Sequence, residues 1–105
     1  MNNDMALNVL QWNLDMLGDD FYKVMSITEI DVARLKSKLK KYGVLTKHEN
    51  YVLLLCVRFC VKLSLQFSLH FNEERDVRMG TKFLSELKDE LMNKISSEYI
   101  AEYER

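Results

Sequence analysis

The longest apolar stretch of the chain runs from Tyr51 to Phe71, and its polar positions fit two structures. From Val57 to Phe71 every odd position is apolar, which is the period-two pattern of a half-buried strand. Four polar side chains in the same stretch also recur at every fourth residue, as on one face of an otherwise apolar helix. These are Arg58, Lys62, Gln66 and His70. Periodicity alone therefore leaves both structures open.

Three other observations favour the helix. A single strand over residues 57–71 would extend roughly 50 Å, well beyond the usual length of about 3–10 residues, and no glycine or proline at residues 44–79 could fold it into a hairpin. The stretch holds six leucines but only three β-branched residues. Thr46 and Glu49 have the spacing of an N-terminal capping box. We therefore predict one long helix with a core formed by Leu54, Val57, Val61 and Leu65.

Three glycines divide the chain into four segments, and each follows a helical pattern at a position where helices often end in a left-handed residue. They are Gly18, Gly43 and Gly80. We expect the second helix to begin at a Ser26 or Thr28 cap, and the last helix at a Thr81 cap. The core stripe of the second helix is Val32, Leu35, Leu39 and Tyr42, and that of the last is Leu84, Leu87, Leu91, Ile95 and Tyr99.

These segments predict an all-α fold, a small four-helix bundle around a long apolar central helix. The alternative is an α+β fold with a long strand or hairpin at residues 57–79. In either case residues 1–105 are expected to form a single domain, since the length and the globular composition suit one core.

The first segment, Asp4 to Leu17, has two apolar stripes on nearly opposite faces of the predicted helix. One stripe is Leu7, Leu10, Leu14 and Leu17, which can pack on the core. The other is Met5, Val9, Trp12 and Met16, which needs a second covering surface. Our hypothesis is that this second stripe binds a partner protein or a second copy of the chain. The alternative is that the Phe21–Met25 link or the last helix covers it.

Charge is distributed unevenly, although the net charge is only −1. Residues 34–62 are basic, whereas residues 1–33 and 63–105 are acidic. The candidate basic patch on the second helix is Arg34, Lys36, Lys38, Lys40 and Lys41. A nucleic-acid surface and internal charge complementarity both explain this pattern, and the absence of a known motif favours the second explanation.

The cysteines, Cys56 and Cys60, lie one helical turn apart in the apolar stretch, as expected for buried reduced thiols in a cytoplasmic protein. A metal site would need more ligands, and His48 and His70 are too far along the helix to join both thiols, so we expect no metal.

Arg58 and Lys62 would make a membrane span costly. The polar, acidic N-terminus does not resemble a secretion signal.

No catalytic motif is present: the sequence lacks a phosphate-binding loop, a nucleophile elbow and a His-Glu-x-x-His pair. We therefore expect a protein that is not an enzyme, with no cofactor and no small-molecule substrate. The function expected is a small protein-binding regulatory module of the inhibitor, adaptor or chaperone type, which self-associates as a dimer. The alternative is a nucleic-acid-binding regulator that uses the basic helix at residues 34–41, although nucleic acid is the less favoured partner.

Overall fold

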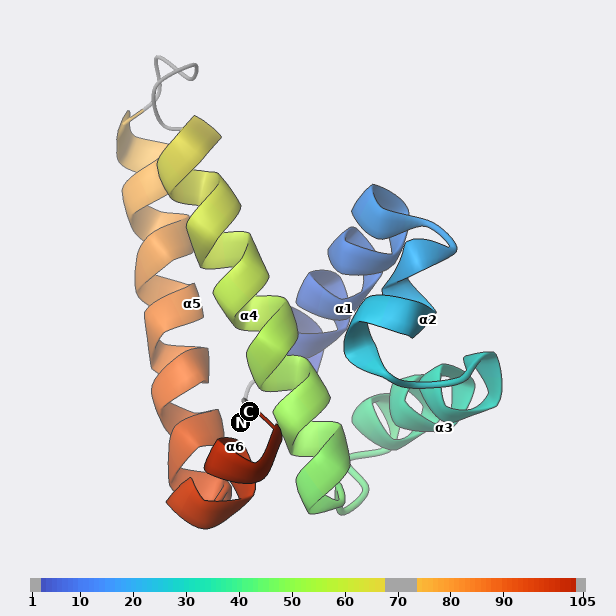
Figure 1. Cartoon of the computed structure of the whole chain (residues 1–105). Coiled ribbons are helices and arrows are strands. Elements are labelled where there is room, and N and C mark those ends of the chain that lie inside the picture. The colour runs from blue at the N-terminus through green and yellow to red at the C-terminus, as the bar shows by residue number, and fades with distance from the viewer. Residues whose placement is uncertain (1–2, 68–73, 104–105) are drawn as a thin grey trace.

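The computed structural model describes residues 3–67 and 74–103, with side chains described for residues 3–62, 82 and 84–102. These residues form helices and no strand, so the fold is all-α (Figure 1). The helices are α1 (Asn3–Leu17), α2 (Asp20–Met25), α3 (Glu29–Lys40), α4 (Lys47–Phe67), α5 (Glu74–Lys94) and α6 (Ser97–Tyr103). The strand or hairpin alternative is wrong for residues 57–67 and 74–79, which are helical, and residues 68–73 lie outside the described part.

Helix α4 is the centre of the structure. Every residue from Glu49 to Leu54 is buried, which means that the first turns of α4 are covered around their whole circumference. Figure 1 shows α5 on one side of α4 and α1, α2 and α3 on the other. Leu54 and Val57 are fully buried as predicted, whereas Val61 is half-buried. The side chain of Leu65 lies outside the described part of the chain.

Two capping boxes set the starts of α3 and α4. The Thr46 hydroxyl accepts a hydrogen bond from the Glu49 N–H at 3.1 Å, and the Glu49 carboxylate accepts one from the Thr46 N–H at 2.9 Å. Thr28 forms the same reciprocal pair with Asp31 at the start of α3. Each pair satisfies two backbone donors that a helix start would otherwise leave unpaired. Both caps were predicted from sequence, with Thr28 and not Ser26 as the cap of α3.

Gly80 and Thr81 do not separate two helices, so the prediction of a helix end and a Thr81 cap there is wrong. Both residues lie inside α5, which begins at Glu74 and includes the polar run that follows it. A glycine in the middle of a helix costs only about 1 kcal/mol relative to alanine, which the packing of a long amphipathic helix can outweigh. The chain bends instead at Ile95 and Ser96, where α5 gives way to α6.

The end of α3 also differs from the prediction. Val32, Leu35 and Leu39 are buried as expected, but α3 ends at Lys40 and Tyr42 is 76% exposed. Tyr42 takes the left-handed conformation (φ 55°), and the N–H of the next residue, Gly43, donates to the carbonyl of Lys38 at 2.8 Å. This is the Schellman helix end, with tyrosine where glycine is usual. The left-handed residue turns the chain out of the helix and removes Tyr42 from the core stripe.

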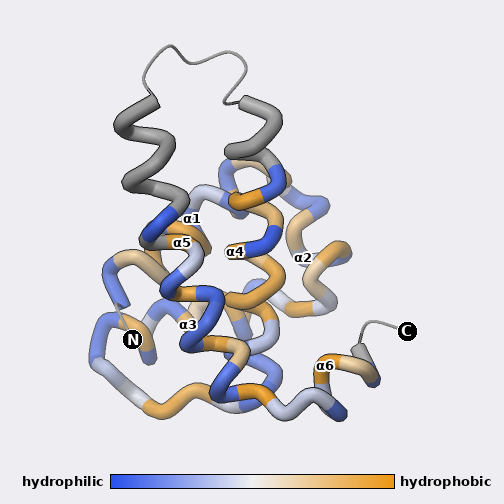
Figure 2. The backbone as a smooth tube through the Cα atoms, turned by 90° about the vertical axis from the view of Figure 1, so that its left-hand side faces the viewer, coloured by the Kyte–Doolittle hydropathy of each residue, from blue (hydrophilic) through white to orange (hydrophobic). Residues whose placement is uncertain are grey.

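The short apolar link after Gly18 is itself a helix, α2, with Phe21 and Met25 buried one turn apart. The pair formed by α4 and α5 extends beyond α1, α2 and α3 at one end (Figure 1). Figure 2 shows that the hydrophobic colour along α4 is interrupted by hydrophilic positions. Among the helices in the described residues, none has both the length and the apolar character needed to cross a membrane.

Shortening a side chain at the centre of α4 tests this description of the core. Leu54→Ala is expected to lower the free energy of unfolding by about 2–5 kcal/mol, because Leu54 is fully buried and its loss leaves a cavity. Urea unfolding followed by circular dichroism measures the change. The matched control is Val24→Ala on α2, where the side chain is 57% exposed and the expected change is within about 0.5 kcal/mol. Equal changes in the two variants would contradict the placement of Leu54.

Candidate functional site

Helix α1 turns a different face to the core from either predicted stripe. Its buried residues are Asn3, Ala6, Val9, Leu10 and Asn13. The core-facing side therefore lies between the two stripes. The leucine stripe contributes Leu10, which is fully buried, and the second stripe contributes Val9, which is nearly fully buried. The apolar pattern of the sequence does not indicate this face, because two of its five buried residues are asparagines.

The side chain of Asn13 connects α1 to α4 inside the core. Its amide Nδ2 lies 2.8 Å from the Val9 carbonyl oxygen, 3.2 Å from the Cys56 carbonyl oxygen and 3.4 Å from the Cys60 sulfur. The two carbonyl oxygens can only accept hydrogen bonds, so they orient the amide with its nitrogen toward them. Asn13 has no exposed surface, and a buried polar group of this kind fixes how two helices are aligned, because other alignments leave it unpaired.

The four residues of the predicted partner-binding stripe differ in how far they are buried. Val9 is buried, Met5 and Trp12 are half-buried against the core, and Met16 is 51% exposed. Trp12 faces Phe59 of α4, with ring centroids 6.3 Å apart and the ring planes tilted by 53°. The cover over Trp12 thus includes α4, which was not among the covering segments considered from the sequence. Phe59 is itself half-buried.

Trp12, Met16 and Phe59 together form the apolar surface where α1 meets the second half of α4, which we name the α1–α4 surface. Met16 follows Trp12 by one helical turn, so both lie on the same side of α1. Exposed charges flank the surface on each helix: Asp15 on α1 and Lys62 on α4. The sequence predicted Trp12 and Met16 as members of a binding stripe, but not Phe59, which was assigned only to the apolar pattern of the central helix.

The basic residues of α3 are largely engaged within the chain. The Arg34 guanidinium lies 3.7 Å from the Asp31 carboxylate, and the Lys36 ammonium donates to the Gln11 side chain at 2.9 Å. The Lys38 ammonium donates to Glu49 at 2.6 Å. Lys40 and Lys41 are exposed beside the end of the helix. Three of the five predicted patch residues therefore contact acceptors in this chain, and two of these acceptors are carboxylates.

The ion pair between Lys38 and Glu49 joins α3 to the start of α4. The Glu49 side chain is only 10% exposed, and burial alone would raise the pKa of its carboxyl group. Hydrogen bonds from Lys38 and from Thr46 stabilise the charged form more strongly, so the pKa of Glu49 is lowered below its usual value. Glu49 is the only acid in residues 34–62, which is a signal that could have indicated this contact.

Burial disfavours the charged thiolate form of both cysteines. Desolvation raises the pKa of Cys56 far above its ordinary value, and the neighbouring Cys60 adds to the effect. Desolvation also raises the pKa of Cys60, against a smaller opposite influence of the hydrogen bond from Asn13. A thiol that stays protonated is a poor nucleophile and a poor metal ligand. In the described residues, no group of three or more His, Cys, Asp or Glu side chains is arranged to hold a metal ion.

The contact between Lys38 and Glu49 predicts a specific pH dependence. Because the folded pKa of Glu49 is lowered, its carboxylate stabilises the fold fully above the unfolded pKa of about 4.5, and this contribution is lost as the pH falls through the folded pKa. Glu49→Gln keeps the Thr46 cap but loses the charge. We expect it to lower the free energy of unfolding by about 1–3 kcal/mol at neutral pH and by progressively less in acid.

Urea unfolding of the wild type and the variant over a pH series measures this difference. Glu86→Gln, at an exposed position on α5, is the control and should leave both stability and its pH dependence nearly unchanged. A Glu49→Gln effect that stays constant from neutral pH into acid would contradict the assignment.

The α1–α4 surface and the Lys38–Glu49 pair each bring together residues that are distant in the sequence, so both depend on the fold. Comparison of the chain with protein-family models, with curated proteins and with solved structures found no match.

Proposed function

We propose that the chain is a small protein-binding module that acts through the α1–α4 surface and pairs there with a second copy of itself. The observation that carries the proposal is the exposure of Met16, 51%, beside two half-buried aromatic rings that come from two packed helices. Tryptophan, phenylalanine and methionine are enriched at the centres of protein interfaces. A surface of this composition gains free energy when a partner removes it from water.

The charges beside the surface favour a second copy as the partner. The α1 side carries Asp15 and the α4 side carries Lys62, both exposed. In a two-fold symmetric pair, α1 of each protomer can lie against α4 of the other, which brings each Asp15 near Lys62 of the partner protomer. In such a pair every contact occurs twice, once in each direction. The same apolar patch and the same two charged residues therefore supply both halves of the interface.

The role we infer is regulatory and not catalytic, of the inhibitor, adaptor or chaperone type. The support is that the two thiols are buried and held protonated, so neither suits nucleophilic chemistry. The same two free cysteines support a cytoplasmic location, because reduced thiols persist there. Nucleic-acid binding by α3 has less support, since Arg34, Lys36 and Lys38 already contact acceptors within the chain.

Light scattering on the purified chain tests the proposal. Over a concentration series at low salt, the wild type is expected to reach twice the chain mass of 12.5 kDa, and Met16→Glu should reduce that mass toward one chain. Trp12→Ala should act in the same direction. Met16→Glu is the more informative variant because Met16 is largely exposed, whereas Trp12 also packs against the core of its own chain. Circular dichroism checks that each variant remains folded.

A charge exchange tests the geometry of the pair. Lys62→Glu alone should weaken pairing by opposing Asp15 of the other protomer, and the double change Asp15→Lys with Lys62→Glu should restore it. Lys88→Glu, at an exposed position on α5, is the control. A wild-type mass of one chain at every concentration, or a double variant no better than Lys62→Glu, would overturn the proposal.

A further inference from the structure

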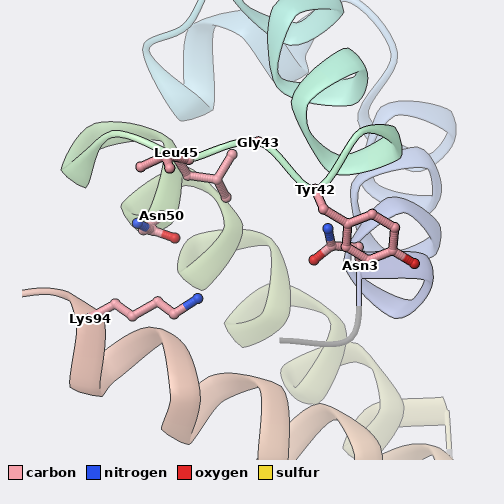
Figure 3. Close-up of a pocket in the computed structure, with 7 residues that line it drawn as sticks. Asn3, Tyr42, Gly43, Leu45, Asn50 and Lys94 are labelled. Atoms are coloured by element: carbon pink, nitrogen blue, oxygen red, sulfur yellow. The ribbon is translucent and has the colours of Figure 1, made fainter.

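A pocket of about 510 Å³ lies at the other end of α1, away from the α1–α4 surface. It forms where the start of α1, the loop between α3 and α4, the start of α4 and the end of α5 meet (Figure 3). Its lining includes Asn3, Tyr42, Val44, Leu45, Asn50 and Lys94. The volume is within the range of about 300–1,000 Å³ that is common for small-ligand sites.

Asn50 places an unpaired hydrogen-bond acceptor in this pocket. The residue is only 7% exposed, yet its side-chain oxygen Oδ1 accepts no hydrogen bond from the other described residues. A buried polar atom without a partner is unfavourable, and most such atoms in folded proteins are paired with protein, water or a ligand. Asn50 lines the pocket, but Oδ1 itself has almost no exposed surface, so a small turn of the Asn50 amide is needed before a ligand N–H in the pocket can reach it.

Lys94 adds a positive charge to the same space. It is the last residue of α5, and it forms no ion pair with another residue in the described part of the chain. Figure 3 shows the ammonium group of Lys94 and the side chain of Asn50 on one side of the pocket, with Asn3 and Tyr42 on the other. A cation next to an unpaired acceptor suits a ligand that carries a carboxylate close to an N–H group.

The loop between α3 and α4 supplies an apolar rim. Tyr42 is 76% exposed and Val44 is 90% exposed, which is unusual for two large apolar side chains so close in sequence. The hydrogen bond from the Gly43 N–H to the Lys38 carbonyl holds this turn against α3 and places Tyr42 at the mouth of the pocket. An apolar group of a ligand can therefore pack on Tyr42 and Val44 while its polar end reaches Asn50 and Lys94.

We propose that this pocket binds an N-acylated α-amino carboxylate with an apolar side chain. Lys94 pairs with the carboxylate, the Asn50 side-chain oxygen accepts the hydrogen bond of the amide N–H, and the apolar side chain contacts Tyr42 and Val44. Both polar groups of such a ligand are attached to one carbon atom, so one small molecule meets both requirements. The same chemistry occurs in a free N-acyl amino acid and at the C-terminus of a peptide.

The proposal is tested by titrating the chain with three related probes. The NMR signals of the side-chain amides and of α4 are recorded during each titration. N-acetyl-L-phenylalanine carries all three groups and is expected to give saturable shifts that include the Asn50 amide. N-acetyl-L-phenylalaninamide lacks the charge, and 2-acetoxy-3-phenylpropanoate lacks the N–H. Each of the two should bind at least about tenfold more weakly. Equal affinities for all three probes, or no saturable shift with N-acetyl-L-phenylalanine, would overturn the proposal.

Three variants assign the contacts, and the NMR spectrum of each one checks that it is folded. Lys94→Gln should weaken binding of N-acetyl-L-phenylalanine to the level of the neutral amide, while Lys82→Gln, an exposed lysine on the same helix, should have no effect. Asn50→Leu should weaken every probe that has an N–H. Asn50→Asp keeps an acceptor but repels the carboxylate, so it should prefer the neutral amide. Unchanged affinity in both Lys94→Gln and Asn50→Asp would exclude this binding mode.

An acetylated tetrapeptide that ends in phenylalanine distinguishes the two sources of the ligand. Tighter binding of the tetrapeptide than of N-acetyl-L-phenylalanine would assign the site to the C-terminus of a protein. Equal binding, with the same dependence on Lys94, would assign it to a free N-acyl amino acid. Because none of the variants lies on the α1–α4 surface, failure here leaves the proposed self-association intact, and the reverse also holds.

Discussion

The fold depends on the burial of the first half of α4 from every side. Residues 49–54 have no solvent-facing member, so no single neighbour can cover them. Helices α1 and α5 pack along α4, Lys38 of α3 pairs with Glu49, and Tyr99 of α6 meets the Tyr51 ring edge-on at 5.9 Å. Further along α4 the cover is thinner, and Phe59 is shielded by Trp12 but remains half-exposed. The candidate binding surface thus lies where α4 keeps a partly exposed aromatic side chain, Phe59.

Polar side chains inside the core specify how the helices align on α4. Asn13 donates to the carbonyl of Cys56, and Asn3 donates to the carbonyl of Leu39 at 3.0 Å, so α1 is tied to both α4 and α3. Asn13 and Asn50 each keep one buried oxygen that accepts no hydrogen bond from the described residues. Asn13 is fully enclosed, whereas Asn50 lines a pocket, so only the Asn50 amide can meet a ligand after a small turn of its side chain. That difference is why the ligand proposal rests on Asn50.

Local signals predicted the parts of the structure that depend on local interactions. The Thr46 and Glu49 spacing identified the start of α4, and the apolar spacing of Val32, Leu35 and Leu39 identified the core face of α3. The α1 face was missed because its orientation is set by hydrogen bonds to distant carbonyl groups, which no periodicity records. The pocket is equally non-local, since it brings Asn3, Asn50 and Lys94 together from three helices.

Amide hydrogen exchange, read residue by residue, tests most directly whether α4 is the element on which the others depend. If it is, the amides of residues 52–57 exchange only through global unfolding, and their protection equals the free energy of unfolding from denaturant. The ends of α2 and α6 should exchange through smaller openings. Faster exchange in residues 52–57 than in the second half of α5 would contradict the account, because the centre of the fold would then lie elsewhere.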